Sequence, residues 1–159
     1  MGSIPPSERE LALMGAALDE ARLAAAESEI PVGALILDPD GKVIATGRNS
    51  RIFAKDPTAH AEVNAIREAA RVLGARVLDG CTLIVTLEPC VMCAGVILAA
   101  RVPKVIFGAW DEKAGAVGSV YDLLRDGRLP HAVPEVVGGV RAEECAALLE
   151  SFFEDRRAH

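Results

Sequence analysis

The chain has 159 residues, of which 51% are hydrophobic and 25% charged, and its formal net charge is −6. This composition is typical of one globular domain and excludes a disordered chain. The negative charge indicates no general affinity for nucleic acid, so an RNA partner would need a local basic patch. No apolar run is long enough to span a membrane, and the first residues lack a signal-peptide pattern. We therefore expect a cytoplasmic protein with reduced cysteines and no membrane partner.

Helical patterns alternate with short apolar strands along the chain. Helices are predicted from a Ser-x-x-Glu capping box at Ser7 and Glu10, from about Thr58 after a loop through Asp56-Pro57, from Cys90 to about Ala100, and through residues 145–153. Strands are predicted at 33–37, 42–48, 82–86, 104–107 and 135–137, the first two joined as a hairpin by the turn at 38–41.

This order of elements predicts the fold class. A hairpin followed by strands that helices connect is typical of an α/β protein, a three-layer α/β/α sandwich with a mixed central sheet of about five strands. We expect a single domain over residues 7–157, preceded by a tail at residues 1–6.

Two distant segments carry the residues of a metal site, His60-x-Glu62 and Cys90-x-x-Cys93. Cys90 and Cys93 share a helix face and can chelate one ion. His60 and Cys90 each begin a helix, so both should lie outside the carboxyl ends of neighbouring strands, where open α/β sheets place their ligands. Three protein ligands leave the fourth position of Zn²⁺ free for water, which distinguishes catalytic zinc sites from structural ones.

Glu62 is predicted to transfer protons and not to bind the metal. Zinc lowers the pKa of its bound water from about 16 toward 7, and Glu62 would take that proton and deliver it to a ring nitrogen and then to departing ammonia. Both His60 and Glu62 reach one site only if His60 lies at an irregular first turn of the helix. The pattern His-x-Glu…Pro-Cys-x-x-Cys is the signature of zinc nucleobase deaminases, so we expect hydrolytic deamination of a heterocycle.

Two other readings of the motif remain open. A structural zinc site would need a fourth ligand, and no remaining candidate stands in a chelating pair; the candidates are Cys81, Cys145, His131 and His159. A thioredoxin-like redox site would also place Cys-x-x-Cys at a helix start, but it leaves His60-x-Glu62 unexplained.

Beyond the metal motif, further segments match a known protein family, and the matching region covers about residues 8–157. They are 31–34, 47–49, 56–62, 86–95, 107–109, 113–116, 118–119, 144–145 and 152–153, with Asp111 between them. In these segments the chain resembles bacterial tRNA-specific adenosine deaminases of the TadA type, within the cytidine-deaminase-like superfamily. The zinc motif marks the superfamily, and the Lys-x-Gly-Ala-x-Gly-Ser stretch from Lys113 together with the last helix points to this branch.

The resemblance implies a specific reaction. It implies a homodimer with one Zn²⁺ per subunit that converts adenosine to inosine at the wobble position of a tRNA anticodon loop. By the same resemblance His60, Cys90 and Cys93 bind the zinc, and Glu62 is the proton shuttle. The target adenosine is already unpaired in that loop, so extruding it costs less than opening a duplex.

Three residues are candidates for contact with the substrate. The resemblance implies that Asn49 binds the flipped nucleoside, a role suited to an amide that offers both a donor and an acceptor. It also implies that Asp111 lies in a loop that borders the RNA near the target nucleotide. His131 is a further candidate, because it lies where a pocket wall could be; it follows Pro130, where many family members have asparagine.

Two alternative functions stay open. The same zinc core would serve a free-base or nucleoside deaminase that acts on guanine or cytosine and needs no phosphate contacts. A zinc-stabilised binding module without activity is the other alternative, and it would not need Glu62.

Overall fold

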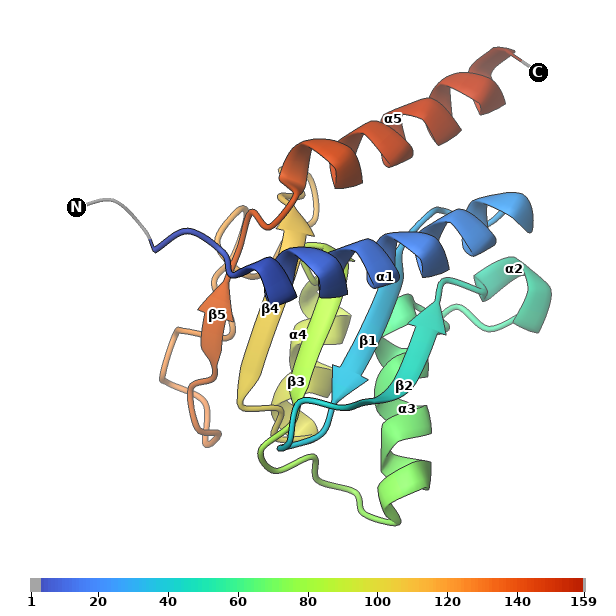
Figure 1. Ribbon diagram of the computed structural model, residues 1–159. Helices are drawn as coiled ribbons and strands as arrows, with labels where there is room; N and C mark the ends of the chain where they lie inside the picture. Colours follow the sequence, from blue (N-terminus) through green and yellow to red (C-terminus); the bar gives the residue numbers. More distant parts are fainter. Residues whose placement is uncertain (1–3, 159) are drawn as a thin grey trace.

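The computed structural model describes residues 4–158, so part of the predicted tail at 1–6 lies outside the described residues (Figure 1). The helices are α1 (Glu8–Ala26), α2 (Arg51–Ala54), α3 (Ala61–Leu73), α4 (Val91–Ala99) and α5 (Ala142–Ala158). The strands are β1 (Gly33–Leu37), β2 (Val43–Arg48), β3 (Thr82–Leu87), β4 (Lys104–Ala109) and β5 (Glu135–Val137). Within residues 4–158 no helix is both long and apolar enough to cross a membrane.

The strands form one mixed sheet of five strands in the order β2-β1-β3-β4-β5. β1 runs antiparallel to both β2 and β3, whereas β3, β4 and β5 are parallel. The parallel pair β3 and β4 requires a crossover, and α4 supplies it. The predicted fold class, a three-layer sandwich around a mixed sheet of about five strands, is confirmed.

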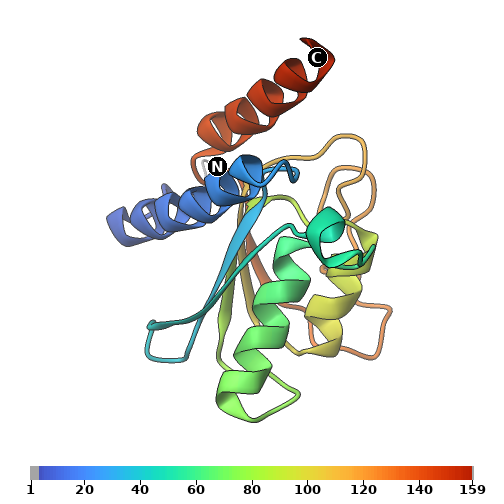
Figure 2. The same cartoon turned by 90° about the vertical axis from the view of Figure 1, so that its right-hand side faces the viewer.

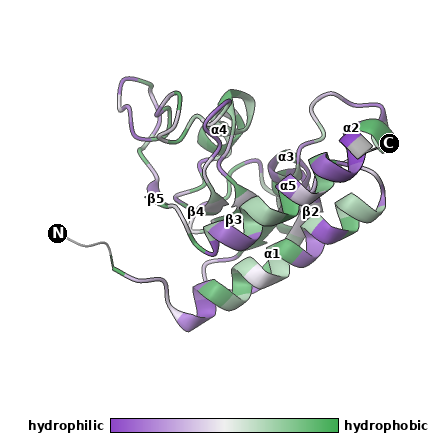
Figure 3. Cartoon of the chain, turned by 90° about the horizontal axis from the view of Figure 1, so that it is seen from above, coloured by the Kyte–Doolittle hydropathy of each residue, from purple (hydrophilic) through white to green (hydrophobic). Residues whose placement is uncertain are grey.

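Helices cover both faces of the sheet, α1 and α5 on one side and α3 and α4 on the other (Figure 2). Successive side chains of a strand point to opposite faces, so each strand contributes to two cores. Leu35, Ile84 and Ile106 pack with residues of α1 and α5, whereas Leu83 and Val85 pack with residues of α3 and α4. In Figure 3 hydrophobic and hydrophilic stretches alternate along α1, as expected of a helix that covers a sheet with one side only.

The start of α1 confirms the predicted capping box. The backbone N–H of Glu10 donates to Ser7 Oγ over 3.0 Å, and the N–H of Ser7 donates to Glu10 Oε1 over 2.8 Å. Within this helix Met14 and Leu18 are fully buried, whereas Leu11 is exposed.

The second predicted helix begins later than expected, at Ala61 and not at about Thr58. Asp56 Oδ1 accepts hydrogen bonds from the backbone N–H and the hydroxyl of Thr58, each 2.8 Å long. These bonds hold the chain in a turn, so the Asp-Pro-Thr pattern marks an Asx turn and not a helix cap. The delay leaves His60 outside the regular helix.

The short helix α2 was not predicted. Its backbone N–H groups at Ile52 and Phe53 donate to the carboxylate of Glu29, over 3.1 and 2.8 Å. That carboxylate is fully buried and lies far away in the sequence, before β1. Because the acceptor is so distant, no local pattern indicates that a helix forms there.

Candidate zinc site

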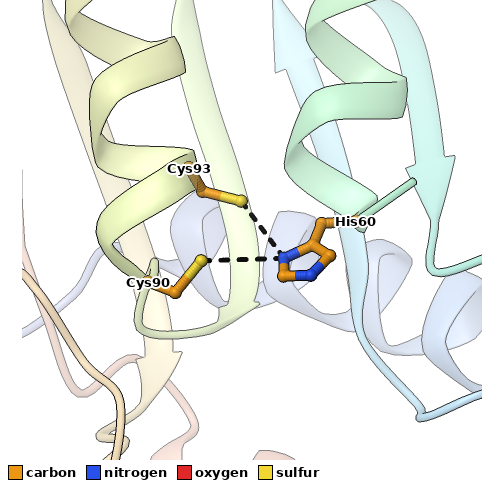
Figure 4. Close-up of side chains that lie close together, drawn as sticks. All are labelled: His60, Cys90 and Cys93. Carbon is orange, nitrogen blue, oxygen red and sulfur yellow. Dashed lines mark hydrogen bonds between the residues drawn. The ribbon is translucent and has the colours of Figure 1, made fainter. Parts of the chain in front are cut away.

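Three potential ligands from two helix starts converge, as Figure 4 shows for His60, Cys90 and Cys93. His60 is the N-cap of α3 and Cys90 is the N-cap of α4, both with extended backbones. His60 Nδ1 lies 3.7 Å from the Sγ of Cys90 and 3.4 Å from that of Cys93. The topology thus brings the two halves of the motif together as expected.

The spacing of these atoms fits a zinc ion. A tetrahedral Zn²⁺ with Zn–N of about 2.0 Å and Zn–S of about 2.3 Å places its nitrogen and sulfur ligands about 3.5 Å apart. The two separations in the structure fall on either side of that value, and all three ligand atoms lie within 4.8 Å of one another. Among the described residues no other histidine, cysteine or carboxylate joins the group.

The other cysteines lie in the cores and not at this centre. Cys81 is buried in the core beneath α3 and α4, and Cys145 in the core beneath α1 and α5. His159, which was also a candidate for a fourth ligand, lies outside the described residues. A three-ligand site leaves one coordination position for water, which argues for a catalytic centre.

Charge at the centre is set by the two thiols and the imidazole. A hydrogen bond with Cys93 lowers the pKa of Cys90 to about 3. Desolvation acts in the opposite direction, and a hydrogen bond with His60 lowers the pKa further. The Cys93 thiol shares its proton in that bond, which raises its own pKa, and the hydrogen bond with Cys90 raises the pKa of His60. These shifts describe the protein without metal, and a divalent cation that binds here displaces the shared protons.

Glu62 lies beside the ligands without joining them. It is in the first turn of α3, and its side chain is only 4% exposed. Burial raises its pKa above the usual range, although its own backbone N–H and the nearby His60 act in the opposite direction. Since His60 is outside the helix with an extended backbone, the geometric condition for both side chains to reach one cavity is met.

A cavity of about 170 Å³ opens over this centre. Its lining combines predicted site residues with residues that the sequence analysis did not select. The predicted ones are Asn49, His60, Glu62, Cys90 and Asp111, and the others are Ile30, Val32, Arg51, Ala61, Leu87, Glu88 and Ala114. Ile30 and Val32 precede β1 and Leu87 ends β3, so for these three residues the position near a strand end was the available signal.

Asn49 and Asp111 enter the cavity from two different strand ends. Asn49 follows β2 and is buried, and its Oδ1 accepts a hydrogen bond of 3.4 Å from the N–H of Arg51. Asp111 follows β4, and its Oδ1 accepts hydrogen bonds from the N–H groups of Lys113 and Ala114, each 3.1 Å long.

The structure does not bring His131 to this cavity. Glu135 at the start of β5 pairs with Lys104 at the start of β4, so the preceding segment lies at the amino ends of these parallel strands. Asp111, by contrast, follows the carboxyl end of β4. His131 lines a separate depression with Arg76 and other residues. The sequence could not show which end of the sheet the long segment before β5 borders.

The family comparison agrees with this geometry. Residues 7–109 match the family model described as the cytidine and deoxycytidylate deaminase zinc-binding region. The fold and the three-ligand centre therefore define a zinc-binding deaminase, and zinc is the metal of this site.

Similar proteins narrow the class further. A tRNA-specific adenosine deaminase from Haemophilus influenzae is 46% identical over 151 residues, which cover 95% of this chain and 87% of that protein. A solved structure from biochemical and structural studies of A-to-I editing by tRNA:A34 deaminases at the wobble position of transfer RNA aligns with a TM-score of 0.83 and 43% identity. That alignment covers 87% of this chain and 99% of the other. The chain belongs to the tRNA-specific adenosine deaminase family.

Some relatives are much longer than this chain. A tRNA(Ile)-lysidine synthase from Deinococcus deserti is 50% identical over 144 residues, which make up 91% of this chain but 27% of that protein. The chain therefore spans about a quarter of the length of such relatives.

Proposed function

We propose that this protein deaminates adenosine to inosine at the wobble position of a tRNA anticodon, in a zinc-dependent hydrolysis. The observation that carries the proposal is the cavity in which the buried carboxylate of Glu62 stands beside a three-ligand zinc centre. The high identity to tRNA-specific adenosine deaminases supports adenosine in tRNA as the substrate.

His60, Cys90 and Cys93 hold the zinc, and when bound the zinc supplies an activated water at neutral pH. Glu62 would accept one proton from that water and pass it to the ring nitrogen next to the amine-bearing carbon, while the water oxygen bonds to that carbon. Glu62 then carries the second proton to the departing amine, which leaves as ammonia while a carbonyl forms. Its raised pKa suits a group that must both take and return a proton near neutral pH.

Asn49 and Asp111 are proposed to hold the target nucleoside. Asn49 is buried and lines the cavity, and its amide offers a donor and an acceptor to a nucleoside. Asp111 also lines the cavity. Arg51 also lines the cavity and can contact a phosphate of the RNA, a contact that a free base does not offer.

The partners and the location follow from the same proposal. We propose one domain over residues 7–157, a homodimer, a tRNA anticodon loop as ligand and the cytoplasm as the location. Two apolar side chains on α2 support self-association, because Ile52 is 64% and Phe53 81% exposed, and Val91 at the start of α4 is also exposed. Adjacent large apolar side chains that are exposed, as Ile52 and Phe53 are, are typical of a protein interface.

The experiment that tests the proposal measures inosine at the wobble position of a tRNA as the salt concentration rises. Phosphate contacts make RNA binding weaken steeply with salt, whereas turnover of a free base changes little. We expect efficient inosine formation at low salt and a steep loss at high salt. Ammonia release from guanine or cytosine that is insensitive to salt, without inosine in tRNA, would support the free-base alternative.

A further inference from the structure

A second buried carboxylate lies in the same cavity, that of Glu88, directly after β3. Its side chain is 2% exposed. Oε1 accepts a hydrogen bond of 3.0 Å from the N–H of Asp111, and Oε2 accepts from the N–H groups of Val117 and Ser119 over 2.9 and 3.1 Å. The Ser119 hydroxyl also donates to Oε1. Three backbone groups and one hydroxyl of segment 111–119 thus surround one carboxylate.

These four donors leave Glu88 no role in proton transfer. An ionised carboxylate has about four lone-pair sites, and four donors occupy them. A buried charge is costly unless it is paired or fully hydrogen-bonded, and here hydrogen bonds from the main chain provide that compensation. Glu88 therefore acts on the structure of segment 111–119 and not on the substrate directly.

The close packing of Gly115 shows how tightly the segment fits around this carboxylate. A Cβ at Gly115 would overlap the carboxyl group of Glu88, so the backbone passes too close for any side chain. The N–H of Gly115 donates to the carbonyl of Asp111 over 2.8 Å, and the N–H of Ala116 donates to the carbonyl of Pro89 over 2.8 Å. Segment 111–119 is therefore hydrogen-bonded to the segment that carries the zinc ligand Cys90.

We infer that Glu88 is a positioning residue for the proposed reaction: its carboxylate holds segment 111–119 so that Asp111 forms the wall that receives the target nucleoside. This inference rests on the proposed function. Asp111 and Ala114 of this segment line the cavity, whereas Glu62 and the zinc ligands are held by the starts of α3 and α4. Loss of the anchor should consequently weaken substrate binding while the zinc centre stays intact.

The test replaces Glu88 by glutamine. Glu88→Gln keeps the size of the side chain but turns an amide group toward backbone donors, so at least one hydrogen bond is lost. We expect the KM for a wobble-adenosine tRNA to rise at least tenfold, with kcat changed less than threefold and the zinc content unchanged. Amide hydrogen exchange should accelerate at Asp111, Val117 and Ser119 but not in α3. An unchanged KM, or a fall in kcat that accompanies loss of zinc, would overturn the inference.

Two further variants disturb the same contact independently. Gly115→Ala pushes the segment away from the carboxylate, and Ser119→Ala removes one donor, so the KM should rise in both, more for the former. Ser119→Thr restores the hydroxyl and is expected to rescue the KM. If Glu88→Gln does not fold, the comparison of Ser119→Ala with Ser119→Thr still tests the role of Glu88. Equal KM values for these two variants would contradict the inference.

A matched control is available in the hairpin turn. Asp38 Oδ1 accepts hydrogen bonds of 2.9 Å from the N–H groups of Asp40 and Lys42, far from the cavity. Asp38→Asn should loosen that turn without changing the KM. Absence of inosine with the unmodified protein would refute the proposed function, whereas normal activity together with a normal KM in Glu88→Gln refutes only the role of Glu88.

Discussion

At the scale of single residues, two buried carboxylates line one cavity and differ in how their charge is compensated. Desolvation raises the pKa of Glu62. Desolvation also acts on Glu88, but hydrogen bonds from Ser119, Asp111 and Val117 outweigh it and lower its pKa. Groups whose environments push their pKa values apart differ in their chemical roles, which supports the proposal of proton transfer for Glu62 and of anchoring for Glu88.

The role of Glu62 predicts the effect of Glu62→Gln. Because a glutamine amide cannot accept and return the proton, we expect inosine formation to fall roughly 10³-fold. The zinc content, measured by elemental analysis, should stay at one ion per chain. Glu68→Gln, on the same helix but in a surface ion pair with Arg71, is the control and should retain activity. Full inosine formation by Glu62→Gln would contradict the role of Glu62 in proton transfer.

The proposed contact of Asn49 with the nucleoside predicts a smaller effect. Asn49→Ala removes a buried hydrogen-bonding amide from the lining of the cavity, and the loss of one such bond should lower kcat/KM about tenfold. Steady-state kinetics with a wobble-adenosine tRNA measures it, alongside zinc content. A kcat/KM equal to that of the unmodified protein would remove Asn49 from the substrate site.

At the scale of elements, the sequence predicted a helix start where the capping partners are neighbours in the chain, and it did not where the partner is far away in the sequence. The capping box of Ser7 placed the start of α1, because donor and acceptor lie within one turn. The start of α3 was misplaced because Asp56 caps a turn and not the helix. The helix α2 was missed because its acceptor, Glu29, is supplied from before β1.

The anchoring of α2 by Glu29 predicts a loss of stability in Glu29→Gln. The buried carboxylate accepts from two backbone N–H groups, and weakening both bonds should lower the free energy of unfolding by about 2 kcal/mol. Denaturant unfolding of the zinc-loaded protein measures this change. Glu154→Gln on the exposed side of α5 should change stability by less than about 0.5 kcal/mol. Equal stability of both variants would contradict the anchoring role.

At the scale of the whole molecule, alternation of helices and strands predicted the sandwich, and the metal motif predicted the convergence of His60 with Cys90 and Cys93. The cavity wall was not predictable, because it depends on the path of long connections. His131 lies at the other end of the strands, and Glu88 acquires its partners only when segment 111–119 folds over it.

The position of the zinc centre outside two complete cores predicts how the protein responds to loss of metal. The ligands lie at helix starts, whereas separate hydrophobic clusters fill both faces of the sheet. A chelator should therefore abolish inosine formation and lower the Tm by several degrees while a cooperative unfolding transition remains. Added Zn²⁺ should restore activity. Complete unfolding on chelation, as in zinc fingers, would contradict this account.

Product stoichiometry distinguishes adenosine deamination in tRNA, at the cavity over His60, Cys90 and Cys93, from deamination of a free base. Zinc-loaded protein is incubated with a tRNA that has adenosine at the wobble position, and inosine and ammonia are both quantified. We expect one ammonia for each inosine formed, at that position only, and no ammonia from free guanine or cytosine. Rapid ammonia release from a free base, with no inosine in the tRNA, would contradict the proposed function.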